Sequence, residues 1–88
     1  MGQQTNLDRF FDVYEESLLH CIDAYPGEYA YGPNMAKSIA AKFKAKAAAH
    51  GFGGINKDGH AFKMTCKKLG IKHTYKAMDE FIKQGGVA

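Results

Sequence analysis

The sequence predicts a small all-α domain of four helices whose last two form a helix-turn-helix-like pair. Three observations favour this fold class. Apolar residues recur at three- and four-residue spacing through most of the 88 residues. Proline and glycine interrupt that spacing where helices would end. The composition, 45% hydrophobic and 24% charged, is that of a globular protein, so residues 1–88 are expected to form one domain around one core.

The first helix is expected over residues 7–25. Thr5 or Asn6 can cap its start, Asp8 lies near the positive end of the helix dipole, and Pro26 and Gly27 end it. Its apolar face is predicted to contain Leu7, Phe10, Phe11, Tyr14, Leu18, Cys21, Ile22 and Tyr25.

The second helix is expected over residues 34–50, with Gly51 ending it. Its inward stripe is predicted to be Met35, Ala36, Ile39, Ala40, Phe43 and Ala47. The outer face is rich in alanine, which has high helix propensity and a short side chain. A protein partner could therefore approach the backbone closely at Ala41, Ala45 and Ala48.

The third and fourth helices are expected over residues 57–69 and 73–84. Asn56 or Asp58 can cap the third helix, and Gly70 suits the left-handed residue that follows it. The predicted inner positions are Ala61, Phe62, Thr65, Cys66 and Leu69, then Tyr75, Met78, Phe81 and Ile82. In the connecting segments, Tyr29, Tyr31, Phe52 and Ile55 are expected to lie on the core.

Cys21 and Cys66 both fall on apolar helix faces and form no CxxC pair. Buried free thiols in a reducing compartment are the preferred interpretation, and a disulfide between the first and third helices is the alternative. No apolar run approaches the roughly 20 residues of a membrane span, and the polar N-terminus lacks the apolar core of a signal peptide. We therefore expect a cytoplasmic protein without a membrane partner.

Charge is distributed unevenly along the chain. Residues 1–33 contain six acids and one base, whereas residues 34–88 contain eleven lysines and three acids. A group that we call the lysine corner, predicted around Gly70, consists of Lys63, Lys67, Lys68, Lys72 and Lys76. Such a group can contact phosphates. Two alternatives remain: lysines are common on solvated helix faces, and the acids of the first helix could neutralise the corner.

The segment from Cys66 to Ile82 resembles a helix-turn-helix, with Cys66 as the small residue and Leu69, Gly70 and Ile71 as the turn. Tyr75 follows Ile71 by four residues instead of five, so the match is to the shape. The resemblance implies that duplex DNA would contact Lys63, Lys67, Lys68, Lys72, His73, Thr74 and Lys76. Because no arginine lies among them, weak sequence specificity is expected.

Catalytic and cofactor motifs are missing from the sequence. Ser17 and Ser38 lack a nucleophile elbow, and His60, Cys66 and His73 lack the paired spacing of structural zinc ligands. We expect a non-enzymatic protein with no cofactor.

The run "NKDGHAFKMTCKKLGIKHTYKAMDEFI" is similar to small uncharacterised accessory proteins of tailed bacteriophages. That resemblance implies a role in binding nucleic acid or a host protein. The alternative to DNA binding is therefore a module that binds and modulates a host or phage protein. The alanine face of the second helix could also serve as the seam of a homodimer.

Overall fold

The structure is a computed structural model that describes residues 5–25, 27, 29, 32–49, 51, 52, 55 and 59–84. The described elements, in chain order, are α1 (Asn6–Ala24), the 3₁₀ turn η1 (Pro33–Met35), α2 (Ala36–Ala48), α3 (His60–Leu69) and α4 (Tyr75–Gln84). The prediction of a small all-α domain with four α-helices is confirmed. None of the described helices is both long and apolar enough to cross a membrane.

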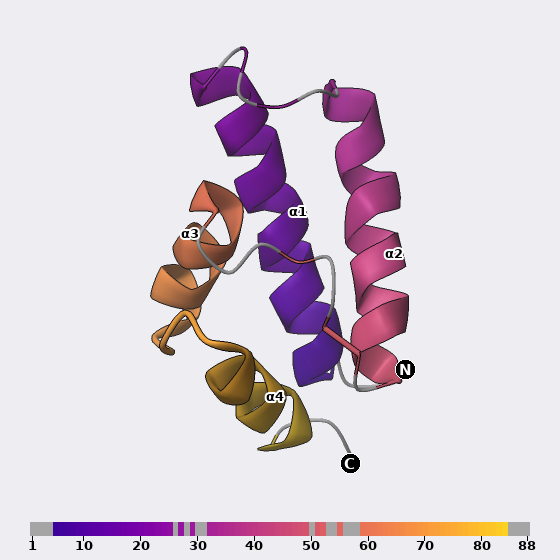
Figure 1. The fold of residues 1–88 in the computed structure, drawn as a ribbon, viewed down its shortest axis with the longest axis vertical. Coiled ribbons are helices and arrows are strands. Elements are labelled where there is room, and N and C mark those ends of the chain that lie inside the picture. The colour runs from indigo at the N-terminus through magenta and orange to yellow at the C-terminus, as the bar shows by residue number, and fades with distance from the viewer. Residues whose placement is uncertain are drawn as a thin grey trace.

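Helix α1 is the centre of the fold. Helix α2 packs along one side of α1, while α3 and α4 pack against its other side (Figure 1). Phe10 is fully buried on α1, and its ring lies 6.0 Å from Phe62 of α3 and 6.4 Å from Phe81 of α4, measured between centroids. Tyr14 of α1 extends this aromatic cluster to Phe43 of α2, 6.2 Å away, so one cluster joins all four helices.

The start of α1 is fixed by a capping box. The Thr5 hydroxyl accepts a hydrogen bond of 3.1 Å from the Asp8 amide, and the Asp8 carboxylate accepts one from the Thr5 amide. Two amides that the helix cannot satisfy itself are thereby paired. Of the two predicted caps, Thr5 is the one observed. Asn6 instead donates its side-chain amide to the Phe81 carbonyl at 2.8 Å, which links the first turn of α1 to α4.

Two apolar side chains that were predicted to face inward are exposed. Tyr25 is 38% exposed because α1 ends at Ala24, and its ring stacks on His60 with centroids 4.5 Å apart. Met35 is 51% exposed because it lies in η1, where the three-residue repeat rotates it out of the α2 stripe. The other predicted inward residues of α1 and α2 are buried or half-buried against the core.

Helices α3 and α4 both begin later than predicted. Helix α3 begins at His60 because Gly59 is extended (φ −76°, ψ 154°), and no side chain caps it; Asn56 and Asp58 lie outside the described residues. Helix α4 begins at Tyr75 because the Thr74 hydroxyl accepts a hydrogen bond from the Ala77 amide at 3.1 Å. Thr74 is therefore the cap of α4.

The connection from α3 to α4 begins with a left-handed glycine, as predicted. Gly70 has φ 72°, its amide donates to the Lys67 carbonyl, and the Ile71 amide donates to the Cys66 carbonyl at 2.9 Å. This is the Schellman pattern, which satisfies the carbonyls that a helix end leaves unpaired.

The core also contains the two cysteines and residues of the segment before α3. Cys21 and Cys66 are both buried free cysteines, as predicted for the two thiols. Ile55 is buried and Phe52 packs against Tyr75, as predicted for this loop. Tyr29 lies on the core, and Tyr31 is outside the described residues.

Candidate nucleic-acid interface

All five lysines of the lysine corner are exposed. Lys63, Lys67 and Lys68 lie on α3, Lys72 follows Gly70, and Lys76 lies in the first turn of α4. The exposure of the three α3 lysines follows from the packing of this helix, whose opposite face is buried on α1 through Ala61, Phe62, Thr65 and Cys66. His73 and Thr74, the other two residues of the predicted DNA contact, are also exposed.

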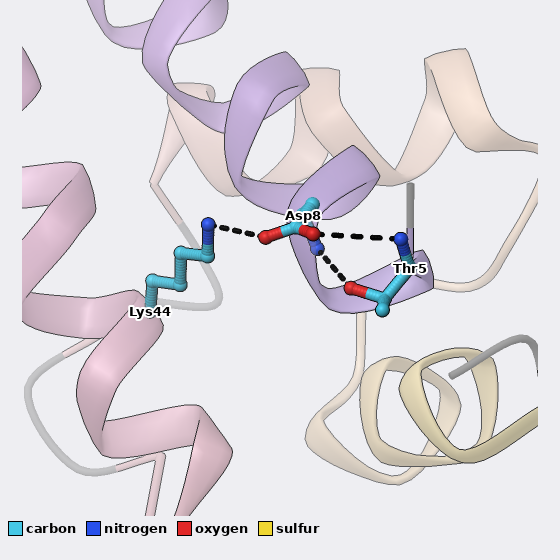
Figure 2. Close-up of polar contacts among 3 residues, drawn as sticks. All are labelled: Thr5, Asp8 and Lys44. Atoms are coloured by element: carbon cyan, nitrogen blue, oxygen red, sulfur yellow. Dashed lines mark hydrogen bonds and ion pairs between the residues drawn. The ribbon is translucent and has the colours of Figure 1, made fainter. Parts of the chain in front are cut away.

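Within the described part of the chain, no residue of the lysine corner forms an ion pair. Three acids of α1, Asp8, Asp12 and Glu15, lie beside α2. Lys44 of α2 forms an ion pair with Asp8, whose second oxygen accepts from the Thr5 amide (Figure 2). The hydrogen bond from Lys44, with a smaller contribution from Thr5, lowers the pKa of the Asp8 carboxyl group below its usual range.

A hollow between α1 and α2 brings more of these charges together. Its volume is about 180 Å³, and it is lined by Phe11, Asp12, Glu15, Lys37, Ala40, Ala41 and Lys44. Asp12 and Glu15 therefore share a site with α2 lysines on one side of α1, while α3 and α4 lie on the other side (Figure 1). The sequence does not predict this hollow, because helical period alone does not say which flank of α1 meets α2.

The exposed side of α4 carries charge of both signs. Lys76 and Glu80 are exposed, and Asp79 forms an ion pair of 2.9 Å with Lys83. A phosphate backbone lying along the whole of α4 would meet Glu80 as well as Lys76. The positive charge is concentrated instead on α3, at Lys72 and at the start of α4.

The second predicted surface lies on α2. Ala41, Ala45 and Ala48 are all exposed, and Ala41 also lines the hollow. Ala41 thus borders the mixed-charge site between α1 and α2, and Ala45 and Ala48 continue the same flank of α2.

The chain has no match among known protein families, curated proteins or solved structures. The resemblance to bacteriophage accessory proteins and the helix-turn-helix character of the α3–α4 pair therefore stay predictions.

Proposed function

We propose that this chain is a small non-enzymatic accessory protein that binds duplex DNA through the lysine corner. The single observation that best supports the proposal is the separation of charge across α1. Five exposed lysines lie on the α3–α4 side and have no ion-pair partner among the described residues, whereas Asp8, Asp12 and Glu15 lie beside α2 lysines. Exposed ammonium groups that form no ion pair attract phosphates.

The contact is to the phosphate backbone. Lysine is a flexible point charge and does not reproduce the forked geometry with which arginine reads guanine. The Thr74 hydroxyl accepts a hydrogen bond from the Ala77 amide, so it caps α4. We therefore expect Lys72 and Lys76 to make the phosphate contacts at the start of α4. Binding of duplexes with unrelated sequences should be similar in affinity.

A salt titration with a fluorescently labelled duplex tests the proposal. At about 50 mM salt the wild type should bind, and the affinity should fall steeply as salt rises. Replacing Lys68 and Lys72 together by glutamine should weaken binding and reduce the salt slope by about 0.9 for each phosphate that the variant no longer neutralises. The charge-matched control replaces Lys42 and Lys46 of α2, on the other side of α1, and should bind like the wild type. No binding at low salt, or equal weakening in the control, would overturn the proposal.

A second candidate function is protein–protein contact through α2, supported by the exposure of Ala41, Ala45 and Ala48 beside the hollow. Ala45→Trp adds bulk to this surface without touching the core. If α2 makes the contact, the substitution should abolish capture of the partner and leave the circular dichroism spectrum unchanged.

A further inference from the structure

On the face formed by α1 and α2, the acidic side chains lie on α1 and the basic side chains lie on α2. Asp12 and Glu15 line the hollow from α1, and Lys37 and Lys44 line it from α2. The lining is completed by the apolar side chains Phe11, Ala40 and Ala41. One half of the face is therefore acidic, the other half is basic, and the seam between them is apolar.

Apolar surface continues beyond the hollow on both helices. Leu19 is 39% exposed and follows Glu15 by one helical turn, a rise of about 6 Å. On α2, Ala45 and Ala48 follow Ala41 at four and seven residues, on the same flank, and both are exposed. Because these side chains are short, a second helix can approach the α2 backbone closely.

We propose that this face binds a second copy of the chain, with α1 of each copy lying on α2 of the other. The proposal deepens the protein-contact candidate by naming its partner, and it does not depend on DNA binding. A closed pair with two-fold symmetry requires a surface that is complementary to itself. A surface with one acidic half and one basic half meets that requirement when the symmetry axis runs parallel to the helices.

The direction of the axis follows from the charges. An axis across the helices would place α1 on α1 and bring Asp12 and Glu15 of the two copies together, which costs free energy. An axis along the helices places the acids of α1 opposite the lysines of α2, twice in each pair. Glu15 follows Asp8 by seven residues and Lys37 precedes Lys44 by seven. Because Asp8 pairs with Lys44 and the two helices run in opposite directions (Figure 1), Glu15 and Lys37 lie at about the same level, and Glu15 of one copy then faces Lys37 of the other.

The pair leaves the lysine corner accessible on both copies. Helices α3 and α4 lie on the other side of α1 from α2 (Figure 1), so neither lies in the proposed seam. Self-association and DNA binding therefore use different surfaces and can be tested separately.

The test exploits the reciprocal contact between Glu15 and Lys37. In a pair of Glu15→Lys chains, lysine would face lysine at both contacts, and in a pair of Lys37→Glu chains, glutamate would face glutamate. Each variant alone should therefore be monomeric in sedimentation equilibrium, with a mass of 9.7 kDa. An equimolar mixture of the two variants restores opposite charges at both contacts. We expect the mixture to sediment at twice that mass, as the wild type does. Repulsion confined to one chain would not be relieved by mixing.

A second pair of variants tests the apolar part of the face. Leu19→Lys should dissociate the pair without unfolding the chain, because Leu19 is already partly exposed. The matched control is Met35→Lys, since Met35 is more exposed, at 51%. Met35 precedes Lys37 by two residues, which places it about 200° around the helix from the α2 flank that lines the hollow.

The outcomes separate the two proposals about this face. A wild type that stays monomeric at millimolar concentration overturns self-association. A dimer that survives Glu15→Lys, Lys37→Glu and Leu19→Lys overturns the choice of face. If the chain is monomeric but Ala45→Trp abolishes capture of another protein, the protein-contact candidate stands and the second copy as its partner is rejected.

Discussion

The hydroxyl group of Tyr75, the first residue of α4, donates a hydrogen bond to the backbone carbonyl of Ile55, twenty residues earlier in the chain. The same ring stacks on Phe52 with centroids 6.1 Å apart and meets Phe62 of α3 edge-on at 6.2 Å. Tyr75 therefore connects the segment between α2 and α3 to both C-terminal helices.

Tyr75→Phe should lower the free energy of unfolding by about 1 to 2 kcal/mol. The substitution keeps the ring in place and removes the hydroxyl that donates to the Ile55 carbonyl. Tyr75→Leu should cost more, because it also removes the stack on Phe52. Urea unfolding followed by circular dichroism measures both values, and equal stability of wild type and Tyr75→Phe would contradict the role assigned to this hydrogen bond.

Gly70→Ala should destabilise the protein by about 1 kcal/mol, because a residue with a Cβ is strained in the left-handed region. Nothing lies within 4 Å of the position that the Cβ would take, so the destabilisation comes from the backbone alone. Gly70→Asn should be less destabilising, since asparagine tolerates this conformation.

Gly32→Ala is the matched control for Gly70. Its added Cβ also meets nothing within 4 Å, and its φ of −92° suits any residue. Thermal unfolding should show a lowered midpoint for Gly70→Ala and an unchanged or slightly raised one for Gly32→Ala. A lowered midpoint in both variants would argue against strain at Gly70.

Asp8 should make stability depend on acid pH. Its pKa is lowered in the folded protein by Lys44 and Thr5, so it stabilises the fold above its unfolded value of about 3.9 and stops doing so as pH falls through the lower folded value. The stability difference between wild type and Asp8→Asn should therefore be present at neutral pH and vanish in acid. The difference should be small, because the Asp8 side chain is 37% exposed and solvent screens its charge.

Two further variants separate the charge of Asp8 from the cap. Thr5→Ala removes the capping hydroxyl and should cost about 1 kcal/mol. Asp23→Asn removes one negative charge near the far end of α1 and should not reproduce the destabilisation seen with Asp8→Asn. A stability difference for Asp8→Asn that persists at the acid limit would contradict the assignment.

Cys66 should be unreactive in the native protein. Burial raises the pKa of its thiol to about 11, so little thiolate forms at neutral pH. Because the folded pKa is above the unfolded value of about 8.5, the stabilisation is complete below that value and is lost as pH rises toward the folded one. Thiol titration should label Cys66 only in denaturant, and Cys66→Ala should flatten the alkaline loss of stability. Rapid labelling of native Cys66 would contradict this account.

The helical faces could be predicted from the sequence because each helix buries its apolar residues in one shared core. The three- and four-residue spacing placed Phe10, Leu18, Phe62 and Met78 correctly in the core. The errors lie at helix ends. Whether Gly59 continues a helix, or whether Thr74 begins one or caps one, depends on local backbone geometry that apolar spacing does not encode.

The uneven distribution of charge could be predicted from the sequence, but the acids and lysines that lie together in space could not. Composition separated an acidic first third from a lysine-rich remainder. Only the packing shows that Asp8 meets Lys44, and that Glu15 shares a hollow with Lys37. Residues this far apart in sequence cannot be paired by periodicity, because the rotation of α2 about its own axis decides which lysines reach α1.

The central place of α1 has a consequence for synthesis on the ribosome. Phe10 is made early, yet the rings that pack against it, Phe62 and Phe81, are made late. Until α3 and α4 have emerged, the nascent α1–α2 hairpin leaves its aromatic side uncovered and is a target for chaperones.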